Sequence, residues 1–190
     1  MELEELEGFR QFCIRCLSRL PAEVVVRETM NGDAYTAAQM AELIAVCDSR
    51  GLDWVRLHAR TVRNQVSLFA TLEREEDPEL NAQLMPPSSV VSVPPELLDD
   101  AHWAGYETLH HDQKDTDIVA LVQGKAVTVP ELLEAIRNRS DIAQAWLLDF
   151  YQEFDRFIAG YGIPDEDEDV GDELDDPDRN SVDVDDGRPL

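Results

Sequence analysis

The chain has 190 residues, of which 43% are hydrophobic, so it holds enough apolar side chains to bury a core and is not disordered throughout. Its 41 acidic and 16 basic side chains give a formal net charge of −25. A surface of that charge repels nucleic acid and anionic membranes, and it attracts basic proteins.

The negative charge is divided between the end of the chain and the rest of it. Residues 164–190 hold 13 acidic side chains and 2 arginines, a net charge of −11. The other 163 residues hold 28 acidic and 14 basic side chains, a net charge of −14. We therefore expect the folded part of the protein to be acidic in its own right.

We expect neither export nor membrane insertion. The opening residues, MELEELEGF, are acidic, whereas a signal peptide starts with basic residues followed by an apolar run. No apolar stretch approaches the roughly 18 residues of a membrane-spanning helix. Three cysteines do not predict a disulfide framework. A reduced, cytoplasmic protein is the expectation, and the preference for arginine over lysine suggests a GC-rich bacterial or phage coding sequence.

The first predicted elements are a helix and a strand. Apolar residues recur every three or four positions over 3–20, which is typical of an amphipathic helix, and Pro21 ends it. The β-branched run EVVVRET (23–29) predicts a buried strand, and the Asn-Gly-Asp sequence at 31–33 predicts a turn.

A second helix is predicted next. Thr36 has the right side chain to N-cap it, and its apolar period runs to about Arg50. Gly51 follows directly, so we expect Gly51 to be the C′ residue that ends this helix in a left-handed conformation.

Two alternating runs, WVRLHART and QVSLFATLE, follow that helix. Strict alternation of apolar and polar residues is typical of half-buried strands. We expect the two runs to pair as a hairpin across VRNQ, with Arg56, His58 and Arg60 on its polar face. A helix over 62–76 is the alternative, because the apolar residues there also fit one helical face.

The second half of the chain predicts a linker and then four elements. The stretch REEDPELNAQLMPPSSVVSVPP contains five prolines and no sustained period, which is typical of a linker. Beyond it we expect a short helix over 96–103 and a hairpin of DIVALVQ and AVTV. Thr128 and Pro130 then lead into a helix, PELLEAIRNR, and Ser140 caps a long amphipathic helix that ends the folded region.

These elements predict an α+β protein: two small lobes of helices packed on short antiparallel β-hairpins, with a disordered acidic C-terminal tail. The expected divisions are an N-terminal α/β lobe at 1–73, a proline-rich linker at 74–94, a C-terminal lobe at 95–163 and the tail at 164–190. The tail holds few large apolar residues, so burial cannot offset the cost of about 1–2 kcal/mol per residue for ordering its backbone.

Two motifs are compatible with metal or redox chemistry. Cys13 and Cys16 form a C-x-x-C pair, but both lie on the apolar stripe of the first predicted helix, where cysteine behaves as a small hydrophobe. Packing in the core is therefore the preferred interpretation over a zinc site or a redox pair. His110, His111 and Asp112 are adjacent, and we expect them to form a solvated loop.

No enzyme signature is present in the sequence. It lacks a serine nucleophile elbow, a P-loop, a Rossmann glycine fingerprint and the H-E-x-x-H motif. We therefore expect a protein that is not an enzyme and that has no catalytic residues, no cofactor and no metal.

The candidate partner-binding residues are clustered carboxylates and one tryptophan. Carboxylates attract basic surfaces, and a tryptophan beside them suits the centre of an interface with an arginine-bearing partner. The carboxylates of this set lie in the predicted linker, before the short helix and in the tail, and the full set is Glu75, Glu76, Asp77, Asp99, Asp100, Trp103, Asp165, Glu166, Asp167, Glu168, Asp169, Asp172, Glu173, Asp175 and Asp176.

A short basic zone interrupts the acidic sequence. Arg56 and Arg60 are expected either to hold the acidic tail of the same molecule or to contact a partner, and a solvated surface is the plainer alternative. Nucleic acid is not an expected ligand, because a protein of this charge is repelled by phosphates.

The function predicted from the sequence is that of an acidic protein that covers a basic, probable nucleic-acid-binding surface of a partner protein. It would act as an inhibitor or nucleic-acid mimic, in a phage, a mobile element or a bacterium. One alternative is a chaperone or assembly factor that shields a basic partner, and another is a small enzyme or regulatory subunit with an autoinhibitory tail. The oligomeric state is left open.

Overall fold

The computed structural model describes residues 7–28, 33–72 and 88–163 of the chain. The predicted α+β fold is confirmed, because these residues form six α-helices and two short antiparallel sheets of two strands each. In chain order the elements are α1 (Glu7–Leu17), β1 (Val25–Glu28), β2 (Ala34–Thr36), α2 (Ala37–Ala45), α3 (Ser49–Leu72), the 3-10 helix η3 (Pro95–Leu97), α5 (Asp100–Leu109), β3 (Ile118–Val122), β4 (Lys125–Thr128), α6 (Val129–Arg137) and α7 (Asp141–Gly160).

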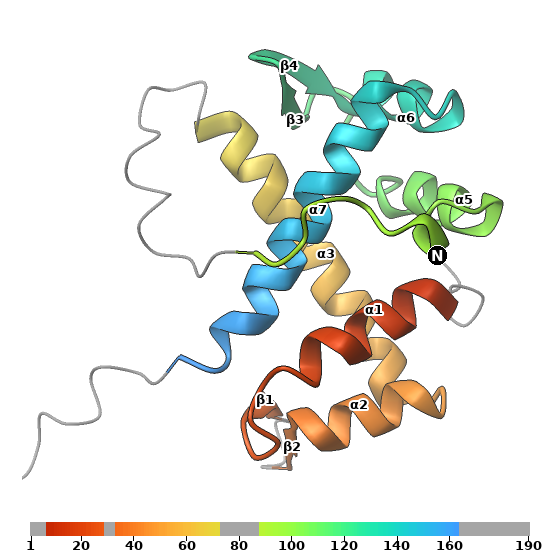
Figure 1. Cartoon of the computed structure of the whole chain (residues 1–190). Helices are drawn as coiled ribbons and strands as arrows, with labels where there is room; N and C mark the ends of the chain where they lie inside the picture. Colours follow the sequence, from red (N-terminus) through yellow and green to blue (C-terminus); the bar gives the residue numbers. More distant parts are fainter. Residues whose placement is uncertain (1–6, 29–32, 73–87, 164–190) are drawn as a thin grey trace, which may run out of the picture.

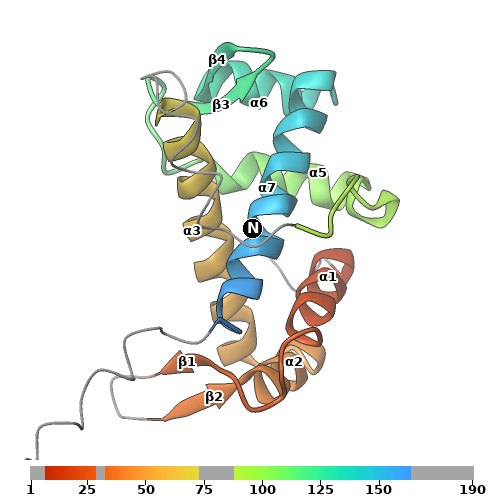
Figure 2. The same cartoon turned by 60° about the vertical axis from the view of Figure 1, so that its left-hand side comes forward.

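The two long helices α3 and α7 pack against each other in the middle of the molecule (Figure 1). α1, α2 and the β1–β2 hairpin lie at one end of this pair, and α6 and the β3–β4 hairpin lie at the other (Figure 2). Buried side chains from both ends belong to one hydrophobic cluster. Within it the ring of Phe9 in α1 meets the ring of Phe154 in α7 edge-on, with 5.5 Å between centroids.

The predicted hairpin of WVRLHART and QVSLFATLE is wrong, because both runs, as far as Leu72, belong to the 24-residue helix α3. The buried side chains of this helix recur every three or four residues, and they include Leu52, Val55, Ala59, Val62 and Val66. Leu57 and Leu68, which the strand pattern would place in the core, are 60% and 54% exposed. The helical alternative is therefore right as far as Leu72, where this described stretch ends, and the helix also includes the first run.

The second helix has the predicted start and a different end. The Thr36 hydroxyl accepts a hydrogen bond from the Gln39 backbone N–H at 3.3 Å, and the Gln39 side chain accepts one from the Thr36 N–H at 3.0 Å. The helix stops at Ala45, and Cys47 takes the left-handed conformation with φ of 56°. Gly51 is not a C′ residue, because it lies in the first turn of α3.

Gly51 serves a different purpose: it lets two helices approach closely. A Cβ atom at this position would lie 2.7 Å from the backbone nitrogen of Ile44 and 2.7 Å from the carbonyl carbon of Leu43. Real Cβ atoms essentially never come that near to backbone, so α2 and α3 can pack in this way only with glycine at position 51.

The C-terminal elements match their sequence signals. The hairpin predicted from DIVALVQ and AVTV is formed by β3 and β4, with Gln123 and Gly124 at φ of 53° and 74° in the two-residue turn. A capping box links Thr128 and Glu131 at the start of α6. Ser140 is the N-cap residue of α7 as predicted, but its hydroxyl forms no capping hydrogen bond among the described residues. The short helix predicted over 96–103 is instead η3 followed by α5.

The predicted acidic tail, the turn at 31–32 and most of the predicted linker lie outside the described residues. In the described part, the buried strand predicted over 23–29 is present in shorter form as β1, which pairs with β2. Val26 is buried as predicted, but Val25 is 42% exposed. Among the helices that the structure describes, none combines the length and the apolar character needed to cross a membrane.

Candidate functional site

The predicted partner-binding residues that the structure describes, Asp99, Asp100 and Trp103, lie together at the start of α5. Asp99 is the N-cap residue, and its carboxylate accepts a hydrogen bond from the His102 backbone N–H at 2.9 Å. That bond and a second one from the His102 ring hold the pKa of Asp99 below its ordinary value. The carboxylate therefore stays charged at the positive end of the helix, where a negative charge is favoured.

Asp100 and Trp103 are joined through one arginine. The Asp100 side chain is 90% exposed and forms a salt bridge with Arg139. The Arg139 guanidinium lies 6.0 Å from the centre of the Trp103 ring, within the range of a cation–π contact. Trp103 itself is only 7% exposed, and its indole N–H donates to the Leu98 carbonyl at 3.0 Å. The tryptophan therefore fixes the position of the acidic helix start and offers a partner little area of its own.

The remaining predicted partner-binding residues fall outside the described part of the chain. They are Glu75, Glu76 and Asp77 of the predicted linker, and the carboxylates at 165–169, 172–173 and 175–176 of the predicted tail.

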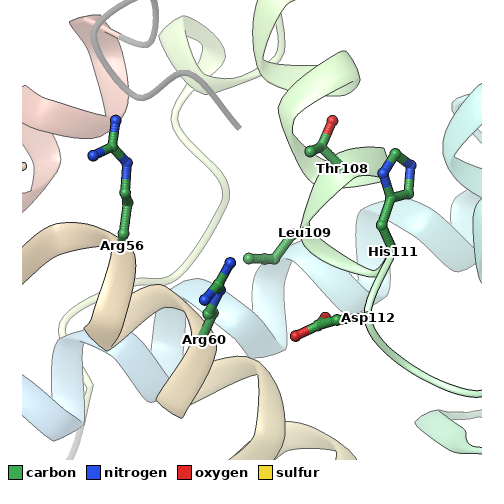
Figure 3. Close-up of a pocket in the computed structure, with 6 residues that line it drawn as sticks. All are labelled: Arg56, Arg60, Thr108, Leu109, His111 and Asp112. Carbon is green, nitrogen blue, oxygen red and sulfur yellow. The ribbon is translucent and has the colours of Figure 1, made fainter. Parts of the chain in front are cut away.

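Arg56 and Arg60 lie on successive turns of α3 and line a hollow of about 280 Å³ (Figure 3). The other side of the hollow is the C-terminal end of α5 and the turn after it, which supply Thr108, Leu109, His111 and Asp112. Figure 3 shows the two arginine side chains reaching toward the space between these elements. Because Leu109 is nine positions after Asp100, the hollow and the acidic helix start are roughly 14 Å apart along α5.

A third arginine, Arg63, links α3 to the opposite wall of this hollow by hydrogen bonds. Arg63 is 4% exposed, and its guanidinium donates to the Leu109 carbonyl, to the Asp112 carboxylate and to the Asn64 side chain at 2.8 and 3.1 Å. The hydrogen bond from Arg63 lowers the pKa of Asp112, and the charge of Arg60 adds to this effect. The negative charge of Asp112 is thus largely neutralised from within the protein.

His58 is not on the face of Arg56 and Arg60, because the strand that was expected to align them is a helix. It is 5% exposed and stacks on Trp54, with ring centroids 4.0 Å apart. Its Nδ1 atom lies 2.6 Å from the Trp54 carbonyl and its Nε2 atom 2.8 Å from the Tyr161 hydroxyl. Burial lowers the pKa of His58 to about 4, so the ring is neutral at pH 7.

The prediction of a solvated loop at 110–112 is wrong for the first of its residues. His111 and Asp112 are exposed, but His110 is 1% exposed and packs against the Trp146 ring at 4.8 Å between centroids. Burial lowers the pKa of His110 to about 4, and its Nδ1 atom bonds the Gln113 side chain. The adjacent histidines therefore point in different directions and do not form one site.

Sequence reasoning missed a buried carboxylate that joins three parts of the fold. Asp155 of α7 is 3% exposed, and it accepts hydrogen bonds from the Arg19 guanidinium, the Ser88 hydroxyl at 3.0 Å and the Ser89 backbone N–H at 2.7 Å. The Cys16 thiol lies 3.6 Å from the same carboxylate. These partners are far away in the sequence, so no local pattern marks Asp155.

The prediction that the C-x-x-C pair packs in the core is confirmed. Cys13 is fully buried and Cys16 is 3% exposed. Burial raises the pKa of both thiols, that of Cys16 to about 11, so neither is a thiolate at neutral pH. Over residues 7–28, 33–72 and 88–163, no three His, Cys, Asp or Glu side chains come together as a metal site requires.

The charge of the molecule is unevenly distributed along the chain. The described residues carry 20 acidic and 13 basic side chains, a net charge of −7, and the other residues carry 21 acidic and 3 basic ones, a net charge of −18. Ten of the 13 basic side chains form salt bridges with described carboxylates. The excess of carboxylates is therefore greatest in 1–6, 73–87 and 164–190.

Comparison of the whole chain with family models, with curated proteins and with solved structures found no match.

Proposed function

We propose that this protein binds a basic surface of a partner protein and thereby keeps that surface from nucleic acid. It acts as an inhibitor that imitates the charge of a nucleic acid. The observation that carries this proposal is the concentration of negative charge in residues 164–190, where 13 acidic side chains stand against 2 arginines.

The spacing of those carboxylates supports imitation of a nucleic acid strand. Residues 164–178 include ten acidic side chains and no basic one. Fifteen extended residues span at most about 50 Å, so ten carboxylates would lie about 5 Å apart. One strand of duplex DNA carries a charge every 3.4 Å or so. The segment therefore presents about two-thirds of the linear charge density of a DNA strand.

The start of α5 supplies a second, fixed group of carboxylates. Asp100 is paired with the exposed Arg139, whose side chain is 52% accessible, and such surface pairs contribute only about 0–1 kcal/mol. An arginine of a partner can replace Arg139 at little cost. Trp103 holds this helix start in place, so the two carboxylates Asp99 and Asp100 are presented in one orientation.

The proposal is tested by capturing the partner on immobilised full-length protein at low salt and then purifying it. In the test variant the nine carboxylates of 165–176 are replaced by Asn or Gln, which are nearly isosteric and neutral. In the control variant residues 164–178 are shuffled, so that charge is kept and order is lost. We expect the neutral variant to lose the partner and the shuffled variant to keep most of its affinity. Equal binding by the neutral variant would contradict the proposal.

Competition with DNA separates inhibition from chaperoning. We expect the full-length protein to displace duplex DNA from the captured partner and to leave the partner inactive, while binding no duplex DNA itself at moderate salt. Release of the partner onto DNA or into a larger assembly would favour an assembly factor instead.

A further inference from the structure

The outward face of α3 differs in character from the rest of this acidic protein. Arg56 and Arg60 are one turn apart, and Leu57 beside them is 60% exposed. Leu68, farther along the same helix, is 54% exposed. A helix face that combines free apolar area with two arginines suits a ligand that is both acidic and partly apolar.

Among the described residues, the two arginines form only one salt bridge with a carboxylate, and that pair is exposed. Arg56 pairs with Asp53 at 3.1 Å, and both side chains are open to solvent, at 39% and 62%. In the part of the chain that the structure describes, no carboxylate lies within salt-bridge distance of Arg60. The one carboxylate in the wall of the hollow, Asp112, is held by the buried Arg63. The hollow can therefore receive an anionic group without first displacing a strong ion pair.

The described chain ends on the far side of α3 from Arg56 and Arg60, within reach of a short extended segment. The hydroxyl of Tyr161, the residue that follows α7, bonds Nε2 of His58 on α3. Viewed along the axis of α3, Leu57 lies about 100° from His58, and Arg60 lies about 160° from His58 in the same direction. Half the circumference of a helix is about 16 Å, so about five extended residues bridge it.

We propose that the acidic segment 164–178 of the same molecule docks on the outward face of α3, with its carboxylates on Arg56 and Arg60. The segment follows directly after Ile163, which makes its arrival at this face intramolecular and fast. Val170 and Leu174 lie among its acids, and one of them supplies an apolar contact for Leu57. The docked segment is withheld from solution until a stronger basic surface competes for it.

The test measures proximity in the full-length protein. A nitroxide is attached to a cysteine introduced as Ser181→Cys in a Cys47→Ser background, since Cys13 and Cys16 are buried and Cys47 is the exposed thiol. Paramagnetic broadening is read on assigned backbone amides. We expect loss of intensity at residues 56–64 and 108–112, and none at β4 on the far end of the molecule. One molar salt shortens the Debye length from about 10 Å at 0.1 M to about 3 Å, and it should restore those signals.

Two matched variants decide the role of the arginines. Arg56→Gln with Arg60→Gln should abolish the broadening, and Arg15→Gln with Arg137→Gln removes the same charge from two other exposed arginines and should leave it unchanged. Unchanged thermal unfolding shows that the first variant is folded.

The proposal is overturned if the broadening is absent, if it covers all faces equally, or if the first variant retains it. Broadening of an isotope-labelled, nitroxide-free copy by a nitroxide-bearing copy would also overturn it, because docking would then be between molecules. Each of these results is independent of whether a partner is captured.

Discussion

The Tyr161 hydroxyl donates a hydrogen bond to Nε2 of His58, with 2.8 Å between the two atoms. The Trp54 carbonyl can only accept, so Nδ1 of His58 carries the proton and donates to it at 2.6 Å. A neutral ring thus satisfies both neighbours. A second proton on Nε2 would reverse the bond to the Tyr161 oxygen and place a positive charge in a buried site. The contacts between α3 and the end of α7 therefore favour the neutral form of His58.

This arrangement makes stability depend on pH. The pKa of His58 is about 4 in the folded protein and about 6.5 when unfolded, so its contribution is complete above pH 6.5 and is lost as the pH falls toward 4. His110 has the same shift and the same sign. Between about pH 7.5 and about pH 5.5 each histidine should lower the free energy of unfolding by about 1.4 kcal/mol.

Urea unfolding at the two pH values checks this prediction. His58→Gln should show a smaller loss on acidification than the parent protein, by about the amount assigned to one histidine. His111→Gln, at an exposed position next to His110, is the control and should keep the full pH dependence. An unchanged pH dependence in His58→Gln would show that this histidine is not the responsible group.

Asp155 should be one of the most sensitive polar positions in the fold. Asp155→Asn removes the charge that Arg19, Ser88 and Ser89 all contact, and hydrogen bonds to charged groups contribute about 1.5–3 kcal/mol. We expect a loss of about 3 kcal/mol in the free energy of unfolding and faster hydrogen exchange at the Ser89 amide. Glu134→Gln on the exposed side of α6 should change neither. Protection of the Ser89 amide in Asp155→Asn would argue against this role.

The close approach of α2 and α3 predicts opposite results for two glycines. Gly51→Ala places a methyl group 2.7 Å from backbone atoms that cannot move aside, and overpacking of this kind costs about 1–3 kcal/mol. Gly160→Ala in the last turn of α7 meets no atom within 4 Å, and alanine favours helix by up to about 1 kcal/mol. Thermal unfolding should therefore fall for the first variant and hold or rise for the second. A stable Gly51→Ala would mean that the two helices are farther apart.

Removal of residues 164–190 should leave the folded part intact. The described residues alone form a hydrophobic cluster whose buried members run from Phe9 to Ile158, and residues 164–190 hold few large apolar side chains. A chain ending at Ile163 should therefore unfold within a few degrees of the full-length protein, as measured by circular dichroism. A fall of 10 °C or so, which corresponds to about 2 kcal/mol or more, would show that the tail is part of the folded unit.

The elements that could be predicted from sequence are those with strong local signals. Thr36 and Thr128 mark helix starts because their capping boxes act within three residues, and Gly124 marks a turn because it adopts positive φ. α3 was mistaken for a hairpin because its apolar residues fit both a period of two and a helical period over short windows. Only packing against α7 and β3 decides between them.

The candidate site was predictable in composition but not in geometry. Arg56 and Arg60 do share a face, as was expected, but they do so as neighbours on a helix rather than on a strand. The opposite wall of their hollow, at Thr108–Asp112, lies some 50 residues away in the chain and has no sequence signal that links it to α3. His58, Asp155 and the buried Arg63 depend in the same way on contacts between distant segments.

The central claim is that the excess of carboxylates is the working surface of this molecule. The most direct test is the salt dependence of the association constant between the full-length protein and its purified partner, measured beside the variant neutralised at 165–176. We predict a constant that falls steeply as salt rises for the parent protein, and a weaker, nearly salt-independent one for the variant. Equal affinities for the two proteins at every salt concentration would contradict the account.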